Sequence, residues 1–279
     1  TGFFNPCNLP LNLQNGLTAY YPFCGNTDDI SSNNRHLTNV GASLTTDRDG
    51  NTNSAYHFDG ASAYLESESF PTNTSSYTFS CWTKSYGVQN DVGIAVQSGG
   101  SGISSYGISS YNSEIRARHR QPPLLGLSAG AFGNNWTHIV STWDGNTVRL
   151  YVNGLLQNIL TVGTHNGFLS TFRIGNVHAS GWGGTYPNSE FYGDIDDVGV
   201  WDRALTSAEV QQLYASGGTN SFLWSTGDTT ASITVNPNQT TTYYITQTEN
   251  GVSCTDSVTV TVNPLPIVTA NANPANICM

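Results

Sequence analysis

Hydrophobic residues in this chain fall into many short β-type runs that Gly, Asn and Asp separate. In the first part of the chain these runs are 17–23, 55–59, 62–67, 77–85 and 92–97. Short strands with turn residues between them are typical of a sandwich or a jelly roll. We therefore expect an all-β fold. Residues 98–134 are less regular, and for them we expect long loops with one or two strands.

The clearest local signal is a predicted three-stranded meander at 135–143, 148–152 and 155–162. Asp144-Gly145 and Asn153-Gly154 separate these runs, and both dipeptides favour tight hairpin turns because they tolerate positive φ. Within the middle run, hydrophobic residues alternate with Arg149 and Tyr151. Successive side chains of a strand point to opposite faces, so this alternation predicts a half-buried strand.

The stretch that begins at Gly193 predicts a long acidic strand followed by a short helix. Asp194, Asp196 and Asp197 stand among the strand formers of 193–201. Thr206 and Glu209 then have the spacing of a capping box, in which each side chain satisfies a free backbone amide of the other. Two glycines at 217–218 predict the end of this helix.

The composition changes after Gly218, where Thr and Ser dominate. The sequence predicts a small all-β module over 218–264, with β-runs at 220–224, 231–235, 241–248 and 256–262. Pro264 and Pro266 then interrupt the pattern. We expect four parts: an N-terminal arm (1–16), a large β domain (17–217), the small module (218–264), and a linker with the start of a further module (265–279).

Charge limits the classes of partner. The chain has 279 residues, with 9 basic against 19 acidic side chains and a formal net charge of −10. Nucleic acid is not an expected ligand, because phosphate binding depends on clustered Lys and Arg. An acidic surface instead favours divalent cations and neutral partners such as sugars. We expect no membrane span, since 18 apolar residues never occur together.

Both ends of the sequence lack the usual terminal signals, and the cysteines are odd in number. The chain starts at Thr1 without a signal peptide, so we expect a mature or excised piece of a larger multidomain protein. Of the five cysteines, Cys7 and Cys24 are able to pair if the arm folds back. Cys81 lies in a β-run, which predicts a small buried hydrophobic residue. Cys254 and Cys278 are left to pair with each other or with residues beyond this sequence.

Six separated motifs give the large domain a family resemblance. They are Leu17-Thr-Ala-Tyr-Tyr-Pro-Phe, Asn-Ser-Ala-Tyr-His-Phe-Asp-Gly60, Asn135-Trp-Thr-His-Ile-Val, Val148-Arg-Leu-Tyr-Val-Asn-Gly154, Phe172-Arg-Ile-Gly-Asn176 and Gly193-Asp-Ile-Asp-Asp-Val. In this order they resemble the laminin G-like domains of the concanavalin A-like lectin/glucanase superfamily, which also includes the pentraxins. The resemblance covers about 17–216. It implies a two-sheet antiparallel jelly-roll sandwich.

The small module resembles the Ig-like repeats of large surface proteins in Bacteroidota, through Leu-Trp-Ser-Thr-Gly-Asp-Thr-Thr and Thr-Thr-Thr-Tyr-Tyr-Ile-Thr. Such proteins are often exported by the type IX secretion system, and some act in adhesion or gliding. The familiar repeat has two further strands before its Trp-Ser-Thr-Gly, which are not evident here. The module is therefore incomplete, or it packs against the lectin-like domain.

The resemblance also implies a calcium ion that joins the closing acidic strand to the loop after the first strand. Here the acid is Asp196 and the loop is 24–36. The loop supplies oxygen ligands of the kind that calcium takes. They are Asp28, Asp29, Ser31, Asn33 and Asn34, of which Asp28, Asp29 and Asn34 are the selected candidates beside Asp196. The alternative is a solvated loop of Asx turns next to an acidic strand edge.

Candidate glycan-binding residues lie in two stretches. The Gly-rich loop 178–186 holds His178, Trp182 and Tyr186, and glycan recognition usually needs exposed aromatic rings with polar groups beside them. Arg118 is the other candidate. It alternates with Arg116 and Arg120, so on a strand the three share one face and suit acidic sugars. The alternative is a solvated edge strand and loop aromatics that cover the end of the sandwich.

An enzyme is not expected. Retaining glycoside hydrolysis needs two carboxyl groups about 5–5.5 Å apart, and the glucanases of this superfamily place them on one strand. Neither Glu66-Ser-Glu68 nor Asp194-Ile-Asp196 reproduces the motif of the glucanases. The sequence thus predicts a secreted, surface-displayed, non-catalytic protein of adhesion or recognition, calcium-stabilised and binding glycans. The alternatives are a structural bead in a surface fibre and a lectin-fold glycoside hydrolase.

Overall fold

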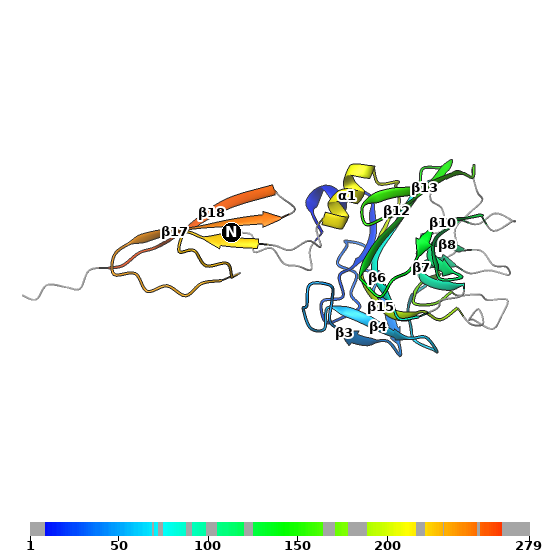
Figure 1. Ribbon diagram of the computed structural model, residues 1–279, viewed down its shortest axis with the longest axis horizontal. Helices are drawn as coiled ribbons and strands as arrows, with labels where there is room; N and C mark the ends of the chain where they lie inside the picture. Colours follow the sequence, from blue (N-terminus) through cyan, green and yellow to red (C-terminus); the bar gives the residue numbers. More distant parts are fainter. Residues whose placement is uncertain are drawn as a thin grey trace, which may run out of the picture. The chain divides into compact units, whose positions relative to one another are not determined.

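The strands of the large domain form two antiparallel sheets that pack face to face (Figure 1). The structure is a computed structural model. It describes residues 9–68, 70–71, 75–87, 91–98, 105–119, 125–163, 171–177, 189–215, 221–230, 232–249 and 252–263. Residues 1–217 and 218–279 make up separate compact units.

Sheet A is the eight-stranded sheet of the described residues. Its strands are β1 (Leu17–Tyr21), β3 (Ser43–Thr45), β4 (Ala55–Asp59), β6 (Tyr77–Ser85), β11 (Thr137–Trp143), β12 (Thr147–Val152), β13 (Leu155–Thr161) and β15 (Tyr192–Trp201). Their order is β13-β12-β11-β6-β15-β4-β3, and β1 pairs with β15. The predicted meander is confirmed as β11, β12 and β13, with Thr142 facing Arg149 across the first hairpin.

Sheet B has seven strands in the part of the chain that the structure describes. They are β2 (Thr38–Val40), β5 (Tyr64–Ser67), β7 (Val92–Ser98), β8 (Ser105–Tyr111), β9 (Glu114–His119), β10 (Leu125–Ala131) and β14 (Thr171–Ile174), in the order β10-β9-β8-β7-β14-β5-β2. The expectation of one or two strands in 98–134 is wrong, because β8, β9 and β10 all lie there. Gly and Ser occupy many outward positions of β8 and β10, which obscures the alternation.

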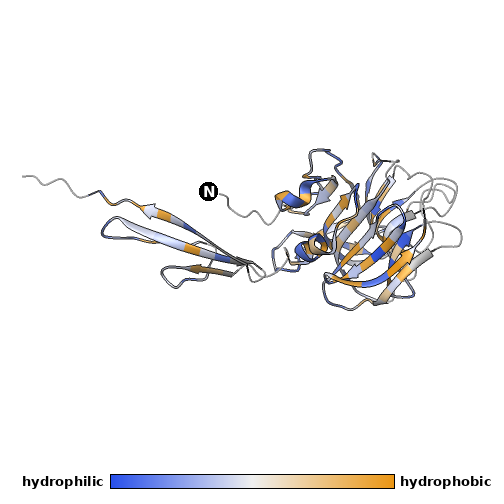
Figure 2. Ribbon diagram, turned by 90° about the horizontal axis from the view of Figure 1, so that it is seen from above, coloured by the Kyte–Doolittle hydropathy of each residue, from blue (hydrophilic) through white to orange (hydrophobic). Residues whose placement is uncertain are grey.

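The main core lies between the sheets. Inward side chains of β6, β14 and β15 meet there, including Phe79, Phe172 and Ile195, all fully buried. Hydrophobic positions are spread along the strands of both sheets, as Figure 2 shows. Burying apolar surface stabilises the fold by roughly 25 cal/mol per Å², so these large side chains supply most of the driving force. Cys81 is free and buried in this core, as predicted, while Cys24 is disulfide-bonded.

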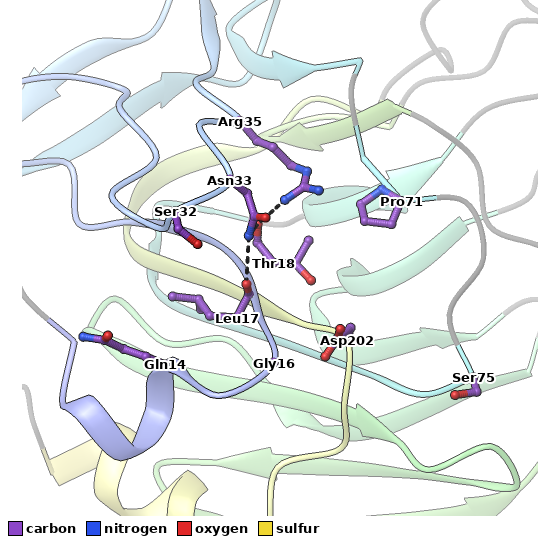
Figure 3. A pocket seen from close by; sticks show the side chains of 10 residues that line it. All are labelled: Gln14, Gly16, Leu17, Thr18, Ser32, Asn33, Arg35, Pro71, Ser75 and Asp202. Carbon is purple, nitrogen blue, oxygen red and sulfur yellow. Dashed lines mark hydrogen bonds between the residues drawn. The ribbon is translucent and has the colours of Figure 1, made fainter.

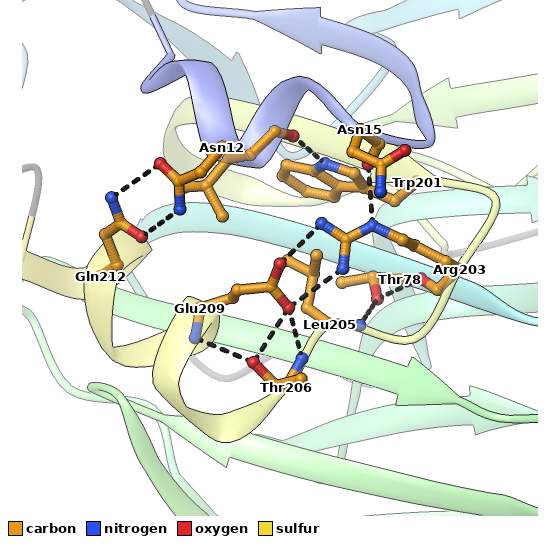
Figure 4. A network of polar contacts seen from close by, with 10 residues as sticks. Asn12, Asn15, Thr78, Trp201, Arg203, Leu205, Thr206, Glu209 and Gln212 are labelled. Carbon is orange, nitrogen blue, oxygen red and sulfur yellow. Dashed lines mark hydrogen bonds and ion pairs between the residues drawn. The ribbon is translucent and has the colours of Figure 1, made fainter.

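A second, smaller core covers part of the outer face of sheet A. Helix α1 (Ser207–Ala215) and the 3₁₀ helix η1 (Leu11–Gln14) pack there around Trp201. The Trp201 indole donates to the carbonyl of Leu13 at 2.7 Å, and the amides of Asn12 and Gln212 exchange two hydrogen bonds (Figure 4). These contacts tie the start of the described chain to its final helix.

The capping box is confirmed at the start of α1. The Glu209 amide donates to Thr206 Oγ1 at 3.3 Å, and the Thr206 amide donates to Glu209 Oε2 at 2.8 Å. Arg203 also donates to both carboxylate oxygens of Glu209 (Figure 4). These hydrogen bonds, chiefly those from Arg203, lower the pKa of Glu209 to about 2. The glycines predicted to end the helix lie outside the described residues.

The small unit contributes a three-stranded sheet, sheet C, from its described residues. It consists of β16 (Ser221–Trp224), β17 (Thr241–Glu249) and β18 (Val252–Val260) in sequence order. The strand expected at 231–235 is wrong, since its described residues 232–235 pair with no neighbour. Side chains described in this unit are all at least partly exposed. Alternation alone does not make a strand where no partner strand is available.

Candidate functional site

The outer face of sheet B carries a row of arginines. On β9, Ile115 and Ala117 point into the core, so Arg116 and Arg118 share the opposite face, as the alternation predicted. Arg173 of β14 also alternates with two core residues and joins the same face. Arg120 lies outside the described residues.

Each of these arginines contacts an acid, and two of them lie over a tyrosine ring. The guanidinium of Arg116 lies 4.4 Å from the ring centre of Tyr111 and 3.7 Å from Glu114. Arg173 lies 4.1 Å from the ring centre of Tyr64 and pairs with Glu66. A cation over an aromatic face contributes about 0.5–1 kcal/mol at an exposed site. The pairs hold both ring and guanidinium at the sheet surface.

Arg118 and Arg116 differ in how far a ligand can reach them. Arg118 is buried and pairs with Asp91. The side chain of Arg116 is 30% exposed, although its Nε is buried. Tyr111 beside it is 41% exposed. The Arg116–Tyr111 pair therefore offers an exposed aromatic ring beside a partly exposed guanidinium, whereas Arg118 is buried and supports the surface.

Small residues leave room for this row. Gly107 faces Arg118 and Ser109 faces Arg116 on the neighbouring strand β8. A Cβ at Gly107 would lie 2.2 Å from the carbonyl oxygen of Ala95, so only glycine fits there. Of the glycan candidates, the structure thus places Arg118. His178, Trp182 and Tyr186 lie outside the described residues.

The residues predicted to bind calcium do not share one site. Asp29 uses its carboxylate within its own loop, where it accepts hydrogen bonds from the amides of Tyr20, Ser31 and Arg35. Asp28 is exposed beside His36. Asn34 is exposed at a left-handed φ of 53°. None of the three is among the contacts of Asp196, so the predicted ligand set does not fit the ion as a single shell.

Asp196 instead pairs with an arginine that the sequence reasoning missed. Arg48, only 9% exposed, lies 2.7 Å from Asp196 and 2.7 Å from Asp197. Its guanidinium also lies 4.6 Å from the ring centre of Trp82. Burial raises the pKa of Asp196 well above its ordinary value, and the charge of Asp197 adds to this. The repulsion between close carboxylates, which suggested a metal, is thus relieved in part by this guanidinium.

A cavity of about 370 Å³ lies beside this ion pair. Its lining includes Asp47, Asp49, Asn51 and Asn53 of the loop before β4. Burial, together with the charges of Asp47 and Asp197, raises the pKa of Asp49. Four aspartates, Asp47, Asp49, Asp196 and Asp197, thus line this cavity together with Arg48. Even so, within the described residues no three Asp, Glu, His or Cys side chains form a group that could hold a metal ion.

A second cavity, of about 390 Å³, opens beside the start of β1 (Figure 3). Its polar lining includes Asp202, Asn33 and Arg35. The Arg35 guanidinium and the Asn33 amide both donate to the carbonyl of Thr18, at 2.7 and 3.1 Å. Two of its polar side chains are thus already engaged in holding the loop against β1. No helix among the described residues has the length and apolar character that crossing a membrane requires.

Comparison with known proteins identifies the family of this chain. Residues 59–211 match the family described as the concanavalin A-like lectin/glucanases superfamily (Laminin_G_3). The chain belongs to this superfamily. C-reactive protein from Rattus norvegicus, a pentraxin, is 31% identical over 100 residues, which are 33% of this chain and 42% of the rat protein. The chain thus spans less than half the length of this curated relative.

Solved structures with the same fold have little sequence in common with this superfamily member. The binding domain of Paraclostridial Mosquitocidal Protein 1 is 15% identical, with a TM-score of 0.56 over 84% of this chain and 64% of that chain. Domain 4 of AbnA, a GH43 extracellular arabinanase from Geobacillus stearothermophilus, was solved in complex with arabinotriose. It is 18% identical, with a TM-score of 0.50 over 71% of this chain and 98% of that chain. At such identities the likeness shows the lectin-like jelly-roll fold.

Sequence signals for the missed residues are weak but present. Arg48 is flanked by Asp47 and Asp49, so a basic residue stands between two acids in the sequence. Arg173 belongs to a quoted family motif, and Tyr111 begins the arginine-rich run. Only the sheet order brings the last two onto one face.

Proposed function

We propose that this lectin-like domain recognises carbohydrate through the outer face of sheet B. The observation that carries the proposal is the exposed Arg116–Tyr111 pair. A sugar presents an apolar ring face, which stacks on an aromatic ring, and hydroxyls, which hydrogen-bond to nearby polar groups. Tyr111 supplies the ring, and the partly exposed guanidinium of Arg116 lies beside it.

Membership in a lectin superfamily supports this assignment. So does the fold shared with a domain that was solved with arabinotriose. Arginine also suits the carboxylates of acidic sugars, because its planar guanidinium offers several donors in a fixed geometry. A glycan or another cell-surface ligand is therefore the proposed partner.

The wider setting is part of the same proposal. The disulfide at Cys24 supports a secreted, cell-surface location, because disulfides persist in oxidising compartments. Non-catalytic adhesion within a larger surface protein is the role that fits such a domain. Calcium stabilisation, type IX secretion and the Ig-like identity of the small unit stay predictions from the resemblance.

Glycan-array binding of the full chain, followed by calorimetric titration of the hits, tests the proposal. Arg116→Ala and Tyr111→Ala should each weaken binding about tenfold, since each removes about one favourable contact. Arg149→Ala is the matched control, because Arg149 is 32% exposed and paired with an acid on sheet A. Equal affinities of all variants would reject this face as the site. An array without hits would favour the alternative that the domain is a structural bead of a surface fibre.

A further inference from the structure

Three rings meet on the outer face of sheet A. His57 of β4, Tyr86 after β6 and Tyr192 at the start of β15 have ring centres 5.7–6.1 Å apart. His57 alternates with core residues of β4, as Asp194 does with Ile195 of β15, so both point away from the main core. We call these three rings the ring cluster.

A buried carboxylate orients two of the rings. Asp194 Oδ1 lies 2.8 Å from Nδ1 of His57, and Tyr86 OH donates to Oδ2. A carboxylate only accepts, so Nδ1 of His57 carries the proton and Nε2 is left for another partner. Burial and the bond to Asp194 raise the pKa of Tyr86 to about 12, so its phenol stays a donor.

The third ring, that of Tyr192, is the most exposed of the three, and backbone contacts fix the strand that carries it. The Tyr86 amide donates to the carbonyl of Tyr192 at 3.0 Å. A Cβ at Gly60 would lie 2.8 Å from the Cβ of Tyr192, so a glycine is needed beneath it. Tyr192 is nevertheless 44% exposed, in contrast to the aromatic rings of the core. Lys84 Nζ lies 5.3 Å from the ring centre of Tyr86 and adds a donor at the same place.

We propose that the ring cluster is a second carbohydrate-binding site, which rests on the proposed function of the domain. A sugar ring stacks on Tyr192, and its hydroxyls bond to His57 Nε2 and Lys84 Nζ. The hydrogen bonds of Asp194 fix the site before a ligand arrives, which lowers the entropy lost on binding. Sheets A and B pack face to face, so their outer faces point apart and the domain binds two glycans at once. Such bivalency strengthens attachment to a surface that carries many copies of the ligand.

Calorimetric titration of the full chain with arabinotriose, and with neutral and acidic disaccharides, tests this site. We expect two sugars per chain. Tyr192→Ala should reduce this to one, and Tyr192→Phe should keep two because the ring remains. His57→Gln should weaken the second site about fivefold through one lost hydrogen bond. Tyr111→Ala, at a position 41% exposed on sheet B, is the matched control and should weaken only the first site, about tenfold.

A second readout does not depend on the variants folding. The imidazole nitrogens of His57 should shift in NMR spectra of the wild-type chain when the sugar is added. Binding that survives Tyr192→Ala with unchanged stoichiometry, or an unshifted His57 at saturation, would overturn the second site alone. Loss of all binding in Tyr192→Ala, with Tyr111→Ala unaffected, would keep the ring cluster and reject the face on sheet B. No binding of any sugar by the wild-type chain would overturn both.

Discussion

On the outer face of sheet A, one arginine compensates the charge of two aspartates. Arg48 is the counter-ion of Asp196 and Asp197, and the Tyr20 hydroxyl donates to Asp197 at 2.7 Å. Breaking a buried ion pair on one side is costly, because the remaining charge stays out of water without a partner. The nearby His138 is buried too, at 3.0 Å from the hydroxyl of Ser80.

Arg48→Met should lower the free energy of unfolding by about 3 kcal/mol at pH 7, since it strands two carboxylates. The pKa of Asp196 is raised in the folded state, so the folded chain binds more protons than the unfolded one above pH ~4. The stability lost by this variant relative to Arg149→Met should therefore shrink as the pH falls from 7 towards 5. Urea unfolding at both pH values measures this. Arg149→Met is the partly exposed control, and equal stability of the two variants would contradict the role given to Arg48.

His138→Gln should make the domain less sensitive to acid. Burial lowers the pKa of His138 to about 3, whereas an unfolded histidine titrates near 6.5. Between these values only the unfolded chain takes the proton, so stability falls by about 1.4 kcal/mol per pH unit as the pH drops. The variant should lose this part of the slope between pH 6 and 4 in urea titrations. The exposed His36→Gln should keep it, and a parallel slope in both would refute the assignment.

At the scale of elements, local signals determine the helix and the hairpin turns, whereas a strand also needs a pairing partner. The capping box and the hairpin dipeptides act over a few residues, and α1 and the meander form where they predict. The run at 231–235 has the alternation of a strand, but no strand pairs with it. Strands therefore depend on their neighbours more than the helix does.

Thr206→Ala should destabilise the domain by about 1 kcal/mol, because the amide of Glu209 loses its acceptor. Thr206→Ser keeps the hydroxyl and should stay near the wild type. Thermal unfolding monitored by circular dichroism is the measurement. If the alanine and serine variants melt together, the cap makes no contribution.

At the scale of the whole molecule, the two units should unfold independently. The main core lies within residues 1–217, and side chains described beyond them are not buried. Removing residues 218–279 should thus leave the main calorimetric transition where it is. A large fall in its midpoint would show that sheet C supports the sandwich.

Calcium is predicted to raise the melting temperature of the same domain relative to EDTA. A ligand that binds only the folded state stabilises it by RT ln(1 + [L]/Kd). The prediction rests on the family resemblance, because the carboxylates around Arg48 form no group among the described residues that could hold a metal ion. Magnesium at equal ionic strength is the control. Identical melting temperatures in calcium and in EDTA would contradict the prediction that the domain binds calcium.

The sequence by itself determined the β class, the family resemblance, the meander and the capped helix, because each rests on local periodicity or on residues a few positions apart. Only the tertiary structure decided that Arg48 meets Asp196, 148 residues away, and that His57 meets Asp194, 137 residues away. Such partners are chosen by sheet order and register, which bring distant strands side by side. The arginine row became a candidate surface for the same reason, once Arg173 of β14 was placed on the face of Arg116 and Arg118.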